Sequence, residues 1–217
     1  MEAITLHAHG PLAVGNGAWH AWKEMVESAR DLRRNPPEVE AAYQQAPPEC
    51  VAEILDGQLH LQPRPRLRHA RAGSRLSNLL GGFDQDDVGG PGGWIILIEP
   101  ELHLGSGPEK IVPDLAGWRR ERMPELPDEA AAELAPDWAC EVLSPGTEAV
   151  DRTTKRRIYA REGVGYLWFV NPEQSTLEAF RLEGGRWVLV DTFEGDETVR
   201  VEPFNAVGLE LGRLWAR

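Results

Sequence analysis

Residues 138–170, WACEVLSPGTEAVDRTTKRRIYAREGVGYLWFV, contain the pattern that decides the fold. Trp138–Leu143 is a short apolar run of the length of a buried strand, and Ser144-Pro145-Gly146 ends it. Asp151–Glu162 is predicted to form a helix that stops at Gly163, and Tyr166–Val170 a further central strand. A strand, a helix and a strand in this order predict a sheet with helices on its faces.

The segments on either side extend this sheet. Two apolar runs around Asp56-Gly57, Val51–Leu55 and Gln58–Gln62, predict a β-hairpin. A helix over Leu67–Leu80 is expected to end at Gly81-Gly82. We expect strands at Trp94–Ile98, at Leu102–Leu104 in the same sheet, and at Ile111–Trp118 as one strand. Residues Thr176–Phe204 predict a hairpin turning at Gly184-Gly185 and a short strand.

The N-terminal part has a different character. Residues 1–17 lack any period and predict a loose arm, whereas the spacing of Trp19, Trp22, Met25 and Val26 predicts a helix over Ala18–Arg33. A short helix is expected over Pro37–Gln45. We therefore divide the chain into an N-terminal arm and helix, residues 1–42, and one α/β domain, residues 43–217, with a mixed central sheet and a β-hairpin-rich C-terminal end.

Composition narrows the class of protein. With 41% hydrophobic and 27% charged residues in 217, the chain has the balance of a globular protein. No apolar run approaches the ~20 residues of a membrane helix, and no secretory signal is evident. The two cysteines, Cys50 and Cys140, lie in unrelated contexts, so we expect a protein of the reducing cytoplasm. The net charge of −12 argues against general coating of nucleic acid. Yet two short windows, Arg64–Arg75 and Arg152–Arg161, contain 10 of the 23 basic residues. They are interpreted either as a local basic groove or as two solvated helix faces.

Three residues are candidates for chemistry. Asp114 and Glu141 sit inside apolar strands, where a carboxylate is costly unless it is paired, hydrogen-bonded or bound to a metal. Two such groups on neighbouring strands suit Mg²⁺. Lys155, one of only three lysines, lies on the helix after the Glu141 strand. The alternatives are a turn residue at Asp114, a buried ion pair at Glu141, and a solvated ion pair between Lys155 and Asp151.

An ordered set of segments carries a resemblance to a known family. Val112-Pro113-Asp114-Leu115, Cys140–Pro145, Asp151–Tyr159 and Gly163–Trp168 resemble the Uma-two family of restriction-endonuclease-like proteins, in the PD-(D/E)XK nuclease superfamily. The Glu53–Leu59 hairpin and His69 match that family's opening. The resemblance covers about Tyr43 to the C-terminus and leaves out residues 1–42.

This resemblance implies a restriction-endonuclease-like core and hydrolysis of phosphodiester bonds with Mg²⁺ (or Mn²⁺). Asp114 and Glu141 would be the metal ligands. The superfamily's usual lysine, two positions after the Glu, is Leu143 here, so Lys155 would take its place beside the attacking water. Glu53 is a further candidate for the metal, or a surface strand residue, and Glu101, which precedes the Asp114 strand, is a candidate third carboxylate. His69 is a candidate phosphate contact, or a helix cap.

Two hypotheses of function remain. The first is a metal-dependent endonuclease acting on nucleic acid, with DNA as the favoured substrate. The second is a catalytically silent protein of the same fold that binds nucleic acid or a protein partner, because fold alone does not establish function. We also expect a homodimer, since two-fold dimers are the commonest oligomers.

Overall fold

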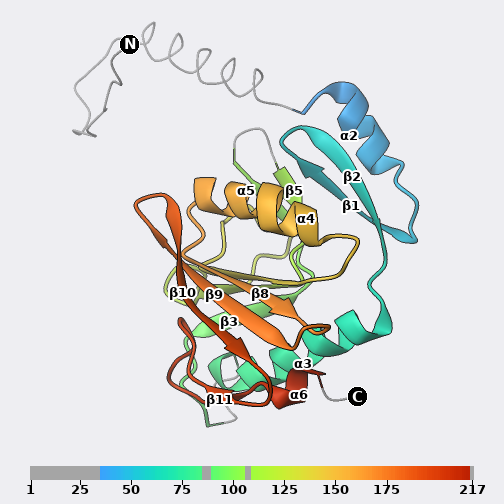
Figure 1. The fold of residues 1–217 in the computed structure, drawn as a ribbon. Helices are drawn as coiled ribbons and strands as arrows, with labels where there is room; N and C mark the ends of the chain where they lie inside the picture. Colours follow the sequence, from blue (N-terminus) through green and yellow to red (C-terminus); the bar gives the residue numbers. More distant parts are fainter. Residues whose placement is uncertain (1–34, 85–88, 106–108, 216–217) are drawn as a thin grey trace, which may run out of the picture.

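The fold is that of a computed structural model, which describes residues 35–84, 89–105 and 109–215 (Figure 1). The arm predicted for residues 1–17 and the helix predicted for Ala18–Arg33 lie outside these residues. The first described element is the helix α2, Pro37–Gln44, close to its predicted bounds. In the described residues no helix is both long and apolar enough to cross a membrane.

A six-stranded mixed sheet forms the centre of the fold. Its strand order is β10-β9-β8-β7-β6-β3, and every neighbouring pair is antiparallel except the parallel pair β7–β8. The strands are β3 (Trp94–Ile98), β6 (Leu115–Arg119), β7 (Trp138–Val142), β8 (Tyr166–Asn171), β9 (Thr176–Glu183) and β10 (Arg186–Glu194). The mixed central sheet that the sequence predicts is thus present, as is the hairpin turning at Gly184-Gly185.

Helices cover both faces of this sheet (Figure 1). A parallel strand pair needs a crossover, which residues 148–161 provide as α4 (Glu148–Val150), the π-helical turn η1 (Asp151–Lys155) and α5 (Arg156–Arg161). The opposite face carries α3 (Leu67–Asp84) and α6 (Gly212–Trp215), with the short strands β11 (Thr198–Val199) and β12 (Leu209–Glu210).

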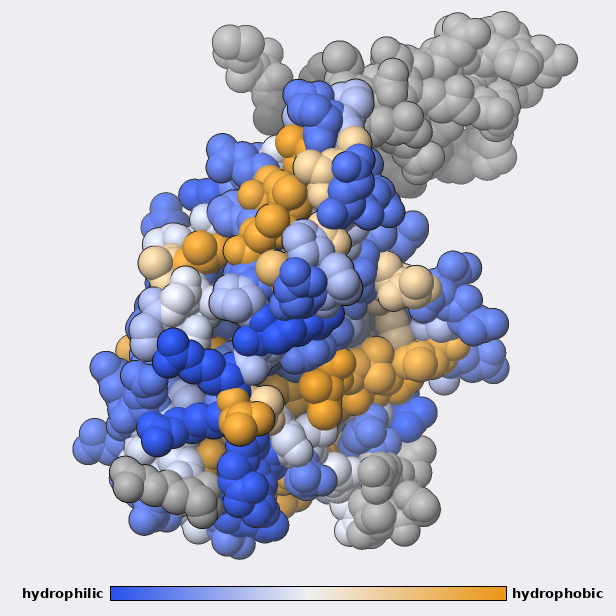
Figure 2. All heavy atoms as spheres, turned by 90° about the vertical axis from the view of Figure 1, so that its right-hand side faces the viewer, coloured by the Kyte–Doolittle hydropathy of each residue, from blue (hydrophilic) through white to orange (hydrophobic). Residues whose placement is uncertain are grey.

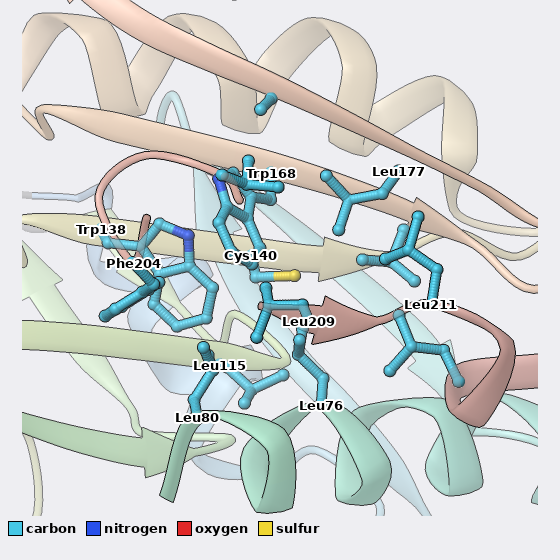
Figure 3. Close-up of a cluster of buried hydrophobic side chains, with 14 of the residues drawn as sticks. Leu76, Leu80, Leu115, Trp138, Cys140, Trp168, Leu177, Phe204, Leu209 and Leu211 are labelled. Carbon is cyan, nitrogen blue, oxygen red and sulfur yellow. The ribbon is translucent and has the colours of Figure 1, made fainter. Parts of the chain in front are cut away.

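Two hydrophobic clusters fill the space between these layers. Alternation along β7 places Trp138, Cys140 and Val142 in the cluster under α3, which Figure 3 shows, and Ala139 and Leu143 in the cluster under α5. Phe204 packs on the rings of Trp94, Trp138 and Trp168 at 4.8–5.6 Å between centroids. The residue between Cys140 and Val142 is Glu141, so the same alternation directs it to the α5 side.

A second, four-stranded sheet corrects two expectations. Its order is β2-β1-β5-β4, from β1 (Cys50–Leu55), β2 (Gln58–Pro63), β4 (Leu102–Leu104) and β5 (Glu109–Ile111). The expectation that Leu102–Leu104 extends the sheet of Trp94–Ile98 is therefore wrong. The single strand expected at Ile111–Trp118 is also wrong, because the chain leaves the second sheet after Ile111 and enters the central sheet at Leu115. Pro113 lies in this break and has no N–H to donate to a ladder.

The β1–β2 hairpin follows its local sequence signal, whereas packing overrides such a signal in the helix α3. The β1–β2 hairpin turns at Asp56-Gly57 as predicted, with positive φ at both residues (49° and 73°), which is the geometry of a type I′ turn. The helix α3 does not end at Gly81-Gly82 but continues to Asp84. Phe83 is 3% exposed and packs in the core, so burial of its ring outweighs the low helix propensity of two glycines.

Candidate active site

One cavity of about 240 Å³ collects most of the candidate residues. It lies where the β1–β2 hairpin, the break between β5 and β6, the end of β7 and the crossover helix meet. Of the six residues that the sequence singled out, five line it: Glu53, His69, Asp114, Glu141 and Lys155. The other residues of the lining that matter below are Val51, Gln62, Pro63, Arg64, Pro65, Arg66, Glu99, Val112 and Asp151.

Asp114 occupies the break between the two sheets. Its Oδ2 accepts a 2.7 Å hydrogen bond from the backbone N–H of Val142, which ties it to the strand of Glu141. Its Oδ1 lies 3.3 Å from Nε2 of His69 on α3. Burial acts to lower the pKa of His69, but the hydrogen bond and charge of Asp114 outweigh it and raise that pKa above its usual value. His69 therefore contacts the carboxylate directly and does not simply cap the helix.

Glu141 is almost completely enclosed, at 2% exposure. Its Oε1 accepts a 2.6 Å hydrogen bond from the hydroxyl of Tyr159, and its Oε2 lies 3.3 Å from Nζ of Lys155. Burial raises the pKa of Glu141 well above its usual value; the charge of Lys155 opposes this shift, and neighbouring carboxylates add to it. Glu141 is thus held in a fixed orientation and shielded from solvent.

Lys155 is the single buried ammonium of this cluster, at 4% exposure. Its Nζ lies 2.9 Å from Oε1 of Glu53, 3.3 Å from the carbonyl oxygen of Val112 and 3.6 Å from Oδ1 of Asp151. The predicted ion pair with Asp151 is present, but it is buried and not solvated, because Asp151 is only 2% exposed. Burial acts to lower the pKa of Lys155, yet the surrounding carboxylates raise it well above its usual value, so the ammonium is charged.

The local conformation of the crossover helix brings both charged side chains to the cavity. Asp151 and Lys155 are the first and last residues of the π-helical turn η1, and both are buried. A π-helical turn inserted in a helix is rare and is frequently found at functional sites. In the sequence, Asp151 stands out only as a partner for Lys155 four residues later. Its burial is what makes it a member of the site.

Glu53 also belongs to the cluster and is not a surface residue, since it is 1% exposed. Its Oε1 accepts a 2.9 Å hydrogen bond from the N–H of Val112, next to the break in the strand, and its Oε2 accepts one of 3.0 Å from Gln62. With Lys155 as third partner, Glu53 joins the hairpin, the break and the crossover helix. Through these contacts Glu53 positions the ammonium of Lys155.

The structure does not bring Glu101 to this cavity. Its Oε1 contacts Nε2 of His103 at 2.6 Å, within the second sheet region. The carboxylate that does line the cavity from this segment is Glu99, an exposed residue with a φ of 48°. Sequence reasoning missed Glu99, and the adjacent Pro100 marks only a turn.

The two basic windows have different surroundings. Arg64 and Arg66 are exposed and line the cavity. In the second window, Arg152 pairs with Glu148 and Glu178, Arg157 with Asp56, and Arg161 with Asp56, Glu109 and Glu162. Arg152, Arg157 and Arg161 are therefore neutralised within the chain, whereas the guanidinium of Arg156 lies 4.9 Å from the centroid of the Phe180 ring and Lys155 is buried.

The donor set is compatible with a hard divalent cation. Three buried carboxyl groups, Glu53, Glu141 and Asp151, surround one buried ammonium, with Asp114 beside them, so acidic groups outnumber basic ones. No three His, Cys, Asp or Glu side chains are grouped as a metal site in the parts of the chain that the structure describes. Mg²⁺ needs only one or two protein carboxylates, because waters and phosphate oxygens complete its shell. Asp114 and Glu141 fit that requirement.

Comparisons with known proteins show the family of this chain and a similar fold. A family model described as "Putative restriction endonuclease" matches residues 37–213. The fold is similar to the crystal structure of a "putative nuclease belonging to DUF820" from Anabaena variabilis, with a TM-score of 0.63 and 20% identity over 80% of this chain and 94% of that one. A search of curated proteins found no match. Because the family model spans most of the chain, the protein belongs to the Uma2 family of restriction-endonuclease-like proteins, as the sequence motifs indicated.

Proposed function

We propose that this protein is a metal-dependent endonuclease that hydrolyses phosphodiester bonds of nucleic acid, with DNA as the favoured substrate. One observation carries the proposal: Asp114, Glu141 and Lys155, from the sheet break, a central strand and the crossover helix, line the same cavity. Membership of a restriction-endonuclease-like family supports the same reaction class.

Each residue has a role that its contacts allow. Asp114 and Glu141 would hold Mg²⁺ or Mn²⁺, which when bound lowers the pKa of a water and offsets charge on the phosphate. The Lys155 ammonium is charged and can donate hydrogen bonds to the attacking water or to a phosphate oxygen. Tyr159 and Glu53 fix Glu141 and Lys155 in place.

The position of Lys155 accounts for the departure at Leu143. Leu143 is 2% exposed and packs in the apolar cluster under α5, where an ammonium would have to be buried among hydrocarbon side chains. Lys155 comes to within 3.3 Å of Glu141 from the neighbouring helix. An ammonium is therefore present beside the same carboxylate, delivered by a different element.

A cleavage assay tests the proposal. Supercoiled plasmid and a long single strand are incubated with the full chain in Mg²⁺ or Mn²⁺, with Glu141→Gln, Asp114→Asn and Lys155→Met beside wild type. We expect the carboxylate variants to be inactive and the lysine variant to lose about 10²–10³-fold, the usual effect of removing one group that stabilises developing charge. Glu101→Gln is the matched control and should keep wild-type activity, because Glu101 lies outside the cavity.

Thermal melting tests the metal separately. A ligand that binds only the folded state adds about 2.7 kcal/mol at 100 times its Kd, so Mg²⁺ should raise the melting temperature of wild type. Glu141→Gln should not respond. Wild-type protein that neither cleaves nucleic acid nor responds to Mg²⁺ or Mn²⁺ would refute the proposal.

One observation favours the catalytically silent alternative. Both carboxylate oxygens of Glu141 already have partners in the chain, Tyr159 and Lys155. A protein of this kind would bind nucleic acid or a protein partner and show no cleavage under any metal. The same two assays separate it from the endonuclease.

A further inference from the structure

Two of the groups proposed to act on the phosphate are almost completely buried where they line the cavity. Glu141 and Lys155 are 2% and 4% exposed, so a reacting phosphate must enter the cavity to contact Glu141. Its volume, about 240 Å³, is smaller than the ~300–1,000 Å³ of pockets that hold drug-sized ligands. A space of this size suits about one nucleotide.

Apolar and charged residues both line the cavity. The hairpin and the linker after it contribute the apolar residues Val51, Pro63 and Pro65 as well as Glu53, while the β5–β6 break, β7 and η1 contribute the other carboxylates and Lys155. Val51 lies two residues before Glu53 on β1, so both side chains project from the same face of that strand. An unpaired nucleotide likewise combines an apolar base with a charged phosphate.

Two arginines line the cavity next to the apolar residues Pro63 and Pro65. Arg64 and Arg66 alternate with Pro63 and Pro65 in the linker between β2 and α3, and both are exposed. Figure 2 views the side of the molecule that carries this hairpin and the start of α3, and shows apolar side chains gathered among hydrophilic ones. The prolines restrict the backbone of the linker, so the arginines are held near the cavity.

Part of the basic surface is not available to a duplex. The chain carries a net charge of −12, and Arg152, Arg157 and Arg161 are each engaged by carboxylates of the same chain. Proteins that bind duplex DNA through its backbone commonly make about 6–10 phosphate contacts. A duplex is also stiff, with a persistence length of about 50 nm, and keeps its bases stacked away from an apolar wall.

From these observations we infer that the cavity takes a single nucleic-acid strand: Val51, Pro63 and Pro65 contact an unstacked base, and Arg64 and Arg66 contact the phosphates that flank the one at Glu141. The inference rests on the proposed function for its reacting phosphate and adds the substrate class. Unpaired bases are commonly recognised by contact of their faces with side chains, and such contacts tolerate any sequence. We therefore expect a preference for single strands or frayed ends without strong sequence specificity.

Binding is measured apart from cleavage. Fluorescence anisotropy follows labelled 20-nucleotide oligo(dT), oligo(U) and a 20-base-pair duplex with the full chain, in Ca²⁺ to prevent hydrolysis. We expect oligo(dT) to bind at least about fivefold more tightly than the duplex, the lower end of what one base contact contributes. Two phosphate contacts predict a log–log salt slope of about −1.4, at about −0.7 per contact, against about −5 or steeper for six contacts on a duplex.

Variants assign the effect to the cavity. Arg64→Ala and Arg66→Ala should each make the salt slope shallower by about 0.7. Val51→Asp, which sets a negative charge beside the base, should weaken oligo(dT) binding about fivefold or more. Val188→Asp is the matched control, an exposed valine on β10 outside the cavity lining, and should bind as wild type. The arginine variants are at exposed positions, so they test the inference even if Val51→Asp fails to fold.

Each outcome of these binding measurements either supports or overturns the inference. Tighter single-strand binding with a shallow salt slope supports the inference, and tighter binding of oligo(U) than of oligo(dT) supports it with ribose as the sugar. Equal or tighter binding of the duplex, no binding of any strand, or arginine variants indistinguishable from wild type would overturn it. Plasmid cleavage with a preference for duplex would support the proposed function and refute this inference. Single-strand binding without any cleavage would support this inference and refute the proposed function.

Discussion

The hydroxyl of Tyr159 donates a 2.6 Å hydrogen bond to Oε1 of Glu141, and both residues are buried. This contact joins the crossover helix to the central strand β7 inside the site. It leaves Glu141 with one oxygen committed to Tyr159 and the other beside Lys155. Tyr159 therefore sets the orientation of the carboxylate that we propose as a metal ligand, and it is not itself part of the cavity lining.

Replacement of Tyr159 by Phe tests this positioning role. The variant leaves a buried carboxylate oxygen without its donor, which costs about 1–3 kcal/mol of folding stability. We expect the affinity for Mg²⁺, measured by calorimetry, to fall about 10–100-fold, as is typical when a residue that orients a metal ligand is lost. Tyr166→Phe, at the half-buried tyrosine of β8, is the control. Loss of stability with unchanged Mg²⁺ affinity would show that Tyr159 is only structural.

The ammonium of Lys155 holds the buried carboxylates together. Lys155→Met keeps much of the side-chain volume but leaves Glu53, Glu141 and Asp151 without their cation. Breaking a buried ion pair by removing one partner costs about 3–5 kcal/mol, so urea unfolding should show a large loss at neutral pH. Lys155→Arg should recover part of the stability because it keeps the charge. A Met variant as stable as wild type would mean that the carboxylates are neutral in the folded protein.

Glu99 is strained, and a glycine there should be more stable. Its φ of 48° places a non-glycine residue in the left-handed region, which costs roughly 1–2 kcal/mol. Glu99→Gly removes that strain but adds chain entropy in the unfolded state, so we expect a net gain of about 0.5–1 kcal/mol in the free energy of unfolding. Glu101→Gly, where φ is not positive, should instead be destabilising. A lower melting temperature for Glu99→Gly than for wild type would contradict the prediction.

The ion pair of Glu40 with Lys110 predicts part of the acid dependence of stability. The hydrogen bond from the Lys110 ammonium lowers the pKa of the Glu40 carboxyl below its usual value. A lowered folded pKa means that this stabilisation is present above the unfolded pKa and is lost as pH falls through the folded value. Glu40→Gln should cost at most about 1 kcal/mol at pH 7, because the carboxylate is 38% exposed and screened by solvent.

Urea unfolding from pH 7 to pH 3 checks this dependence. The difference in unfolding free energy between wild type and Glu40→Gln should shrink toward zero as Glu40 becomes protonated. Glu38→Gln, an exposed position on the same helix, should follow the wild-type curve throughout. A difference that stays constant with pH would mean that the effect does not come from the charge of Glu40.

The sequence determined the parts of this protein that depend on short-range pattern. The β1–β2 hairpin follows from Asp56-Gly57 between two apolar runs, and the strand, helix and strand of residues 138–170 follow from their apolar lengths and stops. Alternation along β7 placed Glu141 on the face opposite to Cys140. These features need only neighbouring residues, because strand and helix periods act over a few positions.

The tertiary structure decided where those pieces meet. Residues 111–118 read as one apolar strand, yet Ile111 and Leu115 pair with different sheets, and only the packing of two sheets creates the break that holds Asp114. The helix α3 passes through Gly81-Gly82 because Phe83 is buried in the core. Glu99, and not Glu101, reaches the cavity. Burial and pairing across tens of residues set these outcomes, and a local sequence pattern contains no information about such distant partners.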